Sequence, residues 1–269
     1  MSDTVVGIDL GTTNSEIAAF RGDRIAILAP HGDKMLPSCV GLSPAGELLV
    51  GTPARNQQLL YPERTVRSIK RKMGSDEMVK IGEQEFSPQE ISSLILRELV
   101  GWASEVLDEP IERAVITVPA YFSDAQRQAT REAGELAGLQ VERVLNEPTA
   151  ASLAYGRGQE QETVLVYDLG GGTFDVSIVR LDGDVTEVLA SAGDNRLGGD
   201  DFNKLLVERL TEQFDQEHGL DLRRDHPVAF SRIWWAVEEA KRALSAGPYA
   251  RIREENLVVE GGRSLHLDV

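Results

Sequence analysis

The sequence predicts an α/β protein made of two duplicated lobes, each with a mixed sheet flanked by helices. Two observations lead to this fold class. Short apolar runs alternate with longer amphipathic segments along the 269 residues, and an Asp-Leu-Gly turn occurs twice, in GIDLGTTNSEIAAFRGD (7–23) and VYDLGGGTFDVSIVRLDGD (166–184). Strand-like runs and then helices follow each copy. An internal repeat of this kind indicates duplicated architecture, and two lobes facing a shared cleft would explain it.

Composition fits this architecture and excludes several classes of function. With 41% hydrophobic and 27% charged residues, the chain is long enough for two cores. No apolar run approaches the roughly 20 residues of a membrane span, and the start MSDTVV has no basic segment before a long apolar one, so we expect a cytoplasmic protein without a membrane partner. A net charge of −16 disfavours nucleic acid as a partner. The single cysteine, Cys39, cannot form an internal disulfide and is expected to be a buried apolar residue.

We expect the first lobe to span residues 1–162, with a small subdomain at about 36–87. The runs VVGIDL, SEIAAF and RIAILA, separated by GTTN and RGD, predict an antiparallel three-stranded meander. Residues 36–52 read as further short strands, 53–73 as mixed polar helix with the basic stretch RSIKRK, and 80–86 as a turn.

Capping patterns mark the helices of this lobe. Ser87, Pro88 and Glu90 form an N-cap, a first-turn proline and a capping box ahead of an apolar helical face. Ser123 and Gln126 form a second capping box. The runs AVITVP and VERVL read as strands, and a short helix follows LNE.

We expect the second lobe to span residues 163–269. The runs TVLVYDL, TFDVSIVRL and VTEVLASA predict a second meander, followed by helices at about 200–218 and about 226–245. The final stretch LVVEGGRSLHLDV resembles a hairpin. The duplicated unit is therefore a three-stranded meander with helices.

The two repeated turns have the chemistry of a polyphosphate clamp. Asp9 precedes the small and hydroxylated residues of 11–14, and Asp168 precedes those of 170–173. Glycines let backbone N–H groups approach an anion, hydroxyls add donors, and carboxylates hold Mg²⁺ directly or through water. The alternative is two tight turns whose Asp and Gly only satisfy turn geometry. Neither a GxxxxGK[ST] loop nor a G-x-G-x-x-G fingerprint occurs, so a different nucleotide fold is required.

Five segments in order carry a family resemblance. IDLGTTNS, ITVPAYFSDAQRQAT, LNEPTAASLAYG, VYDLGGGTFDVS and LGGDDFN resemble the nucleotide-binding domain of the Hsp70 (DnaK-type) chaperones, members of the actin-like ATPase superfamily, and the resemblance covers nearly the whole chain. It implies actin-like (ribonuclease-H-like) lobes with nucleotide in the cleft between them. It further implies an ATP-binding and ATP-hydrolysing module with ATP/ADP and Mg²⁺ as cofactors, K⁺ as an additional candidate ion, and a role in protein folding through a separate peptide-binding domain.

The resemblance also assigns residues to roles. It makes phosphate loops of Gly11, Thr12, Thr13, Asn14, Gly170, Gly171, Gly172 and Thr173. It implies metal-side carboxylates at Asp9, Asp168 and Asp175, and catalytic roles for Lys70, Glu147, Asp168 and Thr173. Without the family, Lys70 would read as part of a solvated basic face and Glu147 as a helix cap favoured by the helix dipole.

The adenosine side is assigned in the same way. Gly198 and Gly199 resemble a further phosphate-facing turn ahead of a helix N-terminus. The segment VEEAKRALS resembles the adenosine-side helix, with the contact residues Glu238, Lys241, Arg242 and Ser245 along one helical face. Without the family, that face would read as an exposed ion-paired surface. The adjacent tryptophans, 234 and 235, are expected to pack rather than to stack on a base.

Partner surfaces follow from the resemblance as well. Pro119, Tyr121 and Arg127 are expected to relay the nucleotide state toward the peptide-binding domain, and Arg143 to contact a J-domain co-chaperone. A nucleotide exchange factor is a second expected partner, and unfolded peptide a third, through the missing domain only.

The sequence departs from the family pattern toward its end. The later Gly-rich adenosine motif, the return of the chain into the second sheet, the linker, the peptide-binding β-sandwich and its lid do not appear, so we expect a chain truncated within the domain. Unpaired strand edges and uncovered apolar surface would follow. Three alternatives remain: a binding-only fragment with little turnover, an actin-like filament protein, and a sugar kinase of the same superfamily, for which no sugar-site motif is found.

Overall fold

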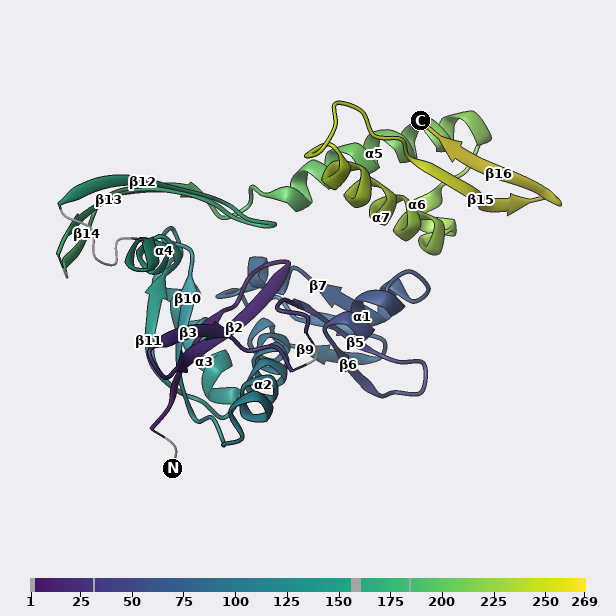
Figure 1. Ribbon diagram of the computed structural model, residues 1–269. Helices are drawn as coiled ribbons and strands as arrows, with labels where there is room; N and C mark the ends of the chain where they lie inside the picture. Colours follow the sequence, from purple (N-terminus) through teal and green to yellow (C-terminus); the bar gives the residue numbers. More distant parts are fainter. Residues whose placement is uncertain (1–2, 31, 156–160, 184) are drawn as a thin grey trace.

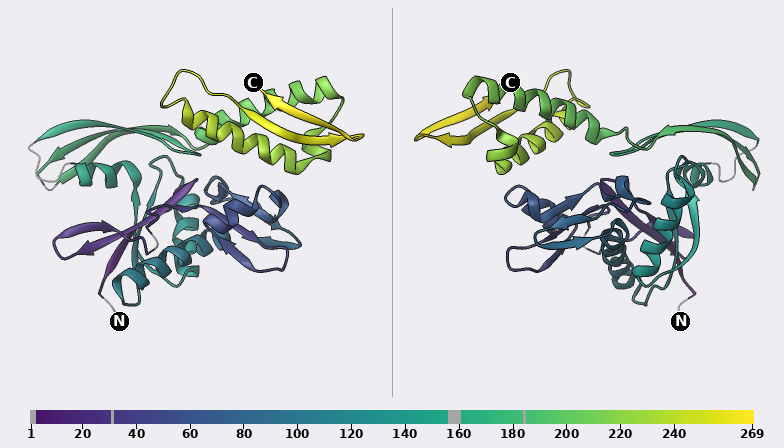
Figure 2. Two further views of the ribbon diagram at one scale, coloured as in Figure 1. Left: turned by 45° about the vertical axis from the view of Figure 1, so that its right-hand side comes forward. Right: turned by 180° about the vertical axis from the view of Figure 1, so that it is seen from behind.

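The chain folds into two tiers that lie one above the other. The computed structural model describes residues 3–30, 32–155, 161–183 and 185–269. The described residues up to 155 form the lower tier in Figure 1, and the described residues from 161 onward form the upper tier. The two further views in Figure 2 show the same separation.

A mixed sheet with the strand order β11-β10-β1-β2-β3 organises the lower tier. Its strands are β1 (Val5–Asp9), β2 (Asn14–Arg21), β3 (Arg24–Ile27), β10 (Arg113–Val118) and β11 (Gln140–Asn146), with β4 (Leu36–Pro37) paired to β2. The predicted meander is confirmed, because β1, β2 and β3 pair antiparallel in sequence order. Strand β10 runs parallel to β1 with Asp9 opposite Thr117. The carboxyl ends of these strands therefore meet at one edge of the sheet.

Two capped helices pack with this sheet into the first core. In α2 (Pro88–Leu107) and α3 (Asp124–Leu136), both predicted capping boxes are present, at Ser87 and Ser123. The α2 residues Ile91, Ile95 and Leu99 are fully buried and belong to one apolar cluster with strand residues of the sheet. The spacing of these residues puts them on one helical face, as the sequence predicted.

The small subdomain contains more strand than the sequence predicted. Its elements are β5 (Cys39–Leu42), β6 (Leu48–Val50), α1 (Thr52–Gln57), β7 (Thr65–Arg67), β8 (Val79–Ile81), β9 (Gln84–Phe86) and the 3₁₀ turns η1 (Pro62–Arg64) and η2 (Ile69–Lys72). The prediction of mixed helix over 53–73 is wrong at β7, which pairs with the central strand β5. The expected turn at 80–86 is a hairpin of β8 and β9. Sheet pairing overrides a weak local helix preference here.

The second meander lies in the upper tier above α4 (Glu147–Tyr155) (Figure 1). It consists of β12 (Glu162–Leu169), β13 (Phe174–Asp182) and β14 (Val185–Asp194), paired antiparallel in sequence order as predicted. One face of β12 is open: the side chains of Leu165 and Tyr167 are 64% and 63% exposed. This agrees with the expectation of uncovered apolar surface in the second lobe.

The remaining elements form a second core, separate from the first. They are α5 (Gly199–His218), α6 (Leu222–Asp225), α7 (Pro227–Ala243), β15 (Arg253–Glu260) and β16 (Arg263–Asp268), and β15 and β16 form the expected hairpin. Val207, Ile233 and Leu257 are buried in their shared apolar cluster. In Figure 1 these helices lie above α1 and the β5–β7 strands.

Within the described parts of the chain, none of the helices combines the length and apolar character needed to cross a membrane. The cytoplasmic location stays a prediction.

Candidate functional site

A cavity of about 680 Å³ lies between the two tiers where the two repeated turns face each other. Many of its lining residues belong to the predicted site: Asp9, Gly11, Thr12, Thr13, Asn14, Lys70, Glu147, Asp168, Gly170, Gly171 and Thr173. The first turn joins β1 to β2, and the second joins β12 to β13. Residues about 160 positions apart in the sequence thus line one cavity because each meander presents its first turn to the other.

The two turns approach each other so closely that only glycine fits at their contact. A Cβ added to Gly171 would lie 1.8 Å from Oγ1 of Thr13, and one added to Gly172 would lie 2.4 Å from Cγ2 of Thr12. The first turn is held from behind, since Ser38 donates from its amide to the carbonyl of Thr13 at 2.8 Å. Glycine is needed here for close approach rather than for a positive φ.

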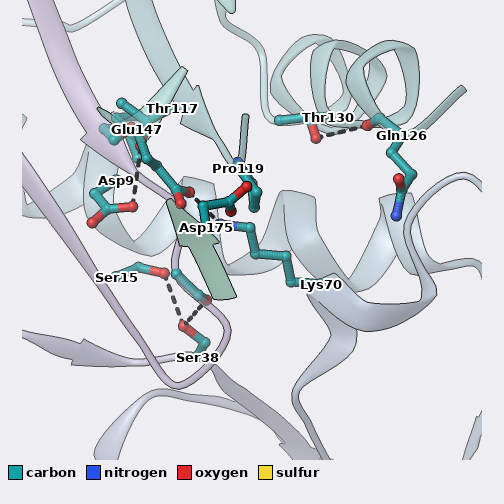
Figure 3. A network of polar contacts seen from close by, with 12 residues as sticks. Asp9, Ser15, Ser38, Lys70, Thr117, Pro119, Gln126, Thr130, Glu147 and Asp175 are labelled. Atoms are coloured by element: carbon teal, nitrogen blue, oxygen red, sulfur yellow. Dashed lines mark hydrogen bonds and ion pairs between the residues drawn. The ribbon is translucent and has the colours of Figure 1, made fainter. Parts of the chain in front are cut away.

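Lys70 and Glu147 form a buried ion pair on one side of this cavity. Lys70 Nζ lies 2.6 Å from Glu147 Oε1, with the two side chains only 5% and 15% exposed. Lys70 comes from η2, and Glu147 is the first residue of α4 directly after β11. Figure 3 shows Lys70 pointing toward Glu147 and Asp175. The pair places a positively charged hydrogen-bond donor and a carboxylate side by side at the edge of the cavity.

The cavity holds more carboxylates than cations. Burial raises the pKa of Glu147 above its ordinary value, against the opposing effect of Lys70, and Asp9 and Asp168 raise it further. Burial also raises the pKa of Asp168, followed by the nearby charge of Asp9. Asp9 itself accepts a hydrogen bond from Thr117 Oγ1 at 3.1 Å. Three crowded carboxylates that share one lysine fit a bound divalent cation, which would relieve their mutual repulsion.

The protein supplies only part of a coordination shell for such an ion. Among the described residues, no group of three or more His, Cys, Asp or Glu side chains is arranged to hold a metal. Mg²⁺ commonly takes one or two carboxylates and completes its shell with water and phosphate oxygens. Asp9 and Asp168 therefore fit Mg²⁺ when phosphate is also present.

Asp175 lies beside the cavity rather than in its lining. Its side chain is buried, and Oδ1 accepts a hydrogen bond from the amide of Tyr121 at 3.1 Å. Burial raises the pKa of Asp175 above its ordinary value, partly offset by this hydrogen bond. Asn195 also donates to the carbonyl of Tyr121, at 3.0 Å. Asp175 therefore forms a contact between the two tiers. Its role at a metal stays a prediction.

The predicted relay residues Pro119 and Tyr121 lie in the loop of residues 119–122, and Arg127 is hydrogen-bonded to that loop. Arg127 donates to the carbonyl oxygens of Phe122 at 3.1 Å and Ala120 at 3.0 Å, and to Asn146 Oδ1 at 2.7 Å. A fourth bond of 3.4 Å reaches the carbonyl of Pro119. The loop is thus tied to the lower tier through Arg127 and to the upper tier through Tyr121.

Gly198 and Gly199 support the second turn from behind and do not line the large cavity. The amide of Gly199 donates to the carbonyl of Gly170 at 3.0 Å, and the amide of Asp200 donates to that of Gly171 at 2.8 Å. A Cβ on Gly198 would lie 2.5 Å from the carbonyl carbon of Gly171. The first turn of α5 therefore packs directly on the second repeated turn.

A smaller cavity of about 80 Å³ adjoins the first, because Thr12, Thr13 and Asn14 line both. Its other walls come from the small subdomain and from α7, including Arg55, Gln58, Arg67, Trp234, Trp235, Glu238 and Arg242. Two of the four predicted adenosine residues, Glu238 and Arg242, thus line it.

The other two predicted adenosine residues lie outside this lining. Lys241 Nζ lies 2.6 Å from Glu238 Oε2 and donates to the carbonyl of Gly199 at 3.1 Å. Ser245 is exposed in the turn after α7, which ends at Ala243. The expectation that all four share one helical face is therefore wrong at Ser245.

Sequence reasoning missed several residues that shape the site. Thr117 could have been found, because alternation along β10 points it away from the buried Ile116 and toward Asp9. Ser68 has no such signal. Its φ of 54° places it in the left-handed region, which costs a non-glycine residue about 1–2 kcal/mol. Its hydroxyl donates to Asp200 of the upper tier.

Arg143 lies apart from both cavities. Its side chain is exposed on β11 and makes no hydrogen bond or ion pair among the residues that the structure describes. The structure thus leaves this arginine accessible on the outer strand of the first sheet.

Comparisons with known proteins agree with the fold. The sequence model of a family described as "Hsp70 protein" matches residues 5–80 and 75–266. The chain is 51% identical over 270 residues to the chaperone protein DnaK of Thermotoga petrophila, a match covering 98% of this chain and 45% of that relative. The DnaK proteins of Thermotoga neapolitana and Thermosipho melanesiensis are 52% and 51% identical with the same coverage.

The chain spans less than half the length of the curated relatives it matches. The family match nevertheless extends over almost all of its residues, including both repeated turns, the Lys70–Glu147 pair and the first turn of α5. The chain belongs to the Hsp70 family, whose actin-like α/β fold its mixed sheets and flanking helices display.

Proposed function

We propose that this chain is the ATP-binding and ATP-hydrolysing module of an Hsp70 chaperone. The observation that carries the proposal is the cavity between the tiers, where two glycine-containing turns face each other beside the buried Lys70–Glu147 pair. Backbone amides of the turns and the hydroxyls of Thr12, Thr13 and Thr173 would hold the phosphates. Two lobes, residues 1–162 and 163–269, would close on one polyphosphate.

Hydrolysis at this site would depend on position and charge. Lys70 would stabilise the developing charge on the γ-phosphate, and Glu147 would accept a hydrogen bond from the attacking water and orient it. Thr173 would donate to a phosphate oxygen. Asp9 and Asp168 would hold Mg²⁺, which supplies charge neutralisation on the phosphates when bound. Glu238 and Arg242 would contact the nucleoside from the smaller cavity.

The chaperone function would act through segments outside this chain. In the proposed scheme, the nucleotide state reaches a peptide-binding domain through Pro119, Tyr121 and Arg127, and the contact of Tyr121 with Asp175 supports this route because it joins the loop to the upper tier. J-domain co-chaperones and a nucleotide exchange factor would set the rates. Arg143→Asp should leave nucleotide binding unchanged and abolish stimulation by a J-domain protein. Arg21→Asp, at the exposed end of β2, should change neither nucleotide binding nor stimulation.

Calorimetric titration with Mg·ADP and Mg·ATP tests the proposal, with Asp168→Asn as the comparison. Binding by the parent that is lost in Asp168→Asn would support the clamp, and single-turnover hydrolysis that disappears in Lys70→Ala would support the ATPase. Binding without turnover would favour the binding-only alternative. Sedimentation of polymer on addition of ATP would favour the filament alternative.

A further inference from the structure

The segment around Lys70 is fastened to the upper tier on both sides of the lysine. Ser68 Oγ donates to Oδ2 of Asp200, and Arg71 Nη1 lies 3.0 Å from Oδ1 of Asp201 in a two-pronged ion pair. Lys70 itself contacts neither aspartate; its Nζ pairs with Glu147. The four consecutive positions 69 to 72 form η2, so a shift of either anchor would move the lysine.

A third contact holds the start of this segment. The guanidinium carbon of Arg67 lies 3.6 Å from the ring centroid of Trp234 on α7. A guanidinium over an indole face at this distance is an attractive cation–π contact. Three residues within the five positions 67–71 therefore contact the upper tier: Arg67, Ser68 and Arg71.

Asp200 and Asp201 are also connected to the second phosphate loop. They occupy the first turn of α5, and the amide of Asp200 donates to the carbonyl of Gly171 at 2.8 Å. A continuous path thus runs from the loop at Gly171 through the first turn of α5 to the two anchors of Lys70. Each link in this path is a hydrogen bond or an ion pair.

The left-handed backbone at Ser68 makes its anchor specific. Ser68 has φ 54° and ψ 31° and precedes η2 without a side-chain cap bond to the helix. Its hydroxyl is directed to Asp200 instead. A residue that sets the entry of a short turn fixes where the next residues point, and Lys70 is two positions farther on.

We propose that Ser68 and Arg71 are positioning residues that couple closure of the second phosphate loop to the placement of Lys70. The inference rests on the proposed ATPase function, since Lys70 is given its role there. The carboxylates of Asp200 and Asp201 bind these two residues and move with the first turn of α5, which is hydrogen-bonded to the second phosphate loop. Neither Ser68 nor Arg71 lines the large cavity. Ser68 and Asp200 line the smaller cavity, but the Ser68 hydroxyl is bonded to Asp200, so both anchors act on hydrolysis through the lysine.

The test combines catalysis with a readout that needs no turnover. Ser68→Ala and Asp200→Ala remove the first anchor and leave the backbone bond from Asp200 to Gly171 in place. Displacement of a reacting group by about 1 Å can cost about 100-fold in rate, so we expect single-turnover hydrolysis to fall by about 10- to 100-fold. The dissociation constant for Mg·ADP should stay within about twofold. Asp200→Asn keeps an acceptor oxygen for Ser68 and should restore the rate.

Amine acylation followed by mass spectrometry reports on Lys70 directly. Lys70 is only 4% exposed, so it should react slowly in the unaltered 269-residue chain and about tenfold faster in Ser68→Ala and Asp200→Ala. Lys72→Ala is the matched control, because Lys72 lies on the same turn but pairs with Glu77 inside the lower tier. That variant should change neither the hydrolysis rate nor the acylation of Lys70.

Two results would overturn the inference: unchanged acylation of Lys70 in both anchor variants, or a loss of Mg·ADP affinity as large as the loss of rate. An unaltered chain that hydrolyses no ATP would count against the proposed function, and the acylation rates would still decide whether the anchors position Lys70.

Discussion

The amide of Tyr121 donates to the carboxylate of Asp175 at 3.1 Å, and this contact joins the loop after β10 to β13, the strand that follows the second repeated turn. The same loop is fixed from the other side by Arg127. Side chains that surround the proposed phosphate site are therefore connected to the outer surface of the lower tier by short, direct hydrogen bonds. The tiers meet through defined polar contacts as well as through the glycine turns.

Replacing Arg127 with alanine should destabilise the chain by about 3 kcal/mol. Its guanidinium makes hydrogen bonds to three backbone carbonyls and Asn146, and bonds to a charged donor contribute roughly 1.5–3 kcal/mol each, without full additivity. Urea denaturation measures the free energy of unfolding. Arg143→Ala is the control, because an exposed arginine without such bonds should change stability by less than about 0.5 kcal/mol. Equal effects of the two substitutions would contradict the structural role of Arg127.

Gly171→Ala should prevent nucleotide binding while the separate cores remain folded. The added Cβ would lie 1.8 Å from Thr13 Oγ1, so the two turns could no longer meet. Titration with Mg·ADP should show affinity lowered by at least about 100-fold, with circular dichroism unchanged. Gly101→Ala is the matched control: it lies in α2 with no atom within 4 Å of the new Cβ, and should raise stability by about 0.5–1 kcal/mol. Tight binding by Gly171→Ala would exclude the close approach of the turns.

In the nucleotide-free protein, the contribution of three carboxylates around the cavity to stability should fall as pH rises from about 4 toward neutral. Burial raises the pKa values of Asp168, Glu147 and Asp175 in the folded chain. The unfolded chain therefore loses these protons first, and the free energy of unfolding falls through the interval between the unfolded and folded pKa values. Thermal unfolding in the presence of a chelator measures this trend.

Asp168→Asn isolates one of these carboxylates. The variant should melt at a higher temperature than the parent at pH 7, because it no longer carries a charge that burial disfavours and Asp9 repels, and the difference should vanish near pH 3. Mg²⁺ with nucleotide should raise the midpoint of the parent but not of the variant. A pH-independent difference would show that titration of Asp168 is not its cause.

Lys70→Ala should abolish ATP hydrolysis and lower the free energy of unfolding. Removing the lysine leaves Glu147 buried with no opposite charge, and breaking a buried pair typically costs about 3–5 kcal/mol. The double variant Lys70→Ala with Glu147→Gln should recover most of that stability and none of the hydrolysis. Urea denaturation and single-turnover assays measure the two quantities separately. A double variant as unstable as the single one would argue that the pair is not coupled.

Local patterns predicted much of the fold. The capping boxes at Ser87 and Ser123, both meanders and the final hairpin all depend on residues within a few positions of each other, and each is present. The subdomain was predicted less well, because β7 has only three residues and is stabilised as a strand by β5, a partner some 25 positions earlier in the sequence. Ser245 falls outside α7 because the helix ends two residues before it.

By itself, the sequence determined most of the elements outside the small subdomain, the duplicated turns with their carboxylates and the family, because these depend on local spacing and on recognisable motifs. Only the tertiary structure decided which distant side chains meet. It pairs Lys70 with Glu147, 77 positions away, and Ser68 with Asp200, 132 positions away. It also packs Gly198 against Gly171 and Gly172 of the second repeated turn. The first pair depends on how the small subdomain packs beside the first sheet, and the other contacts depend on how the two tiers close on each other. No periodicity or short motif encodes that geometry.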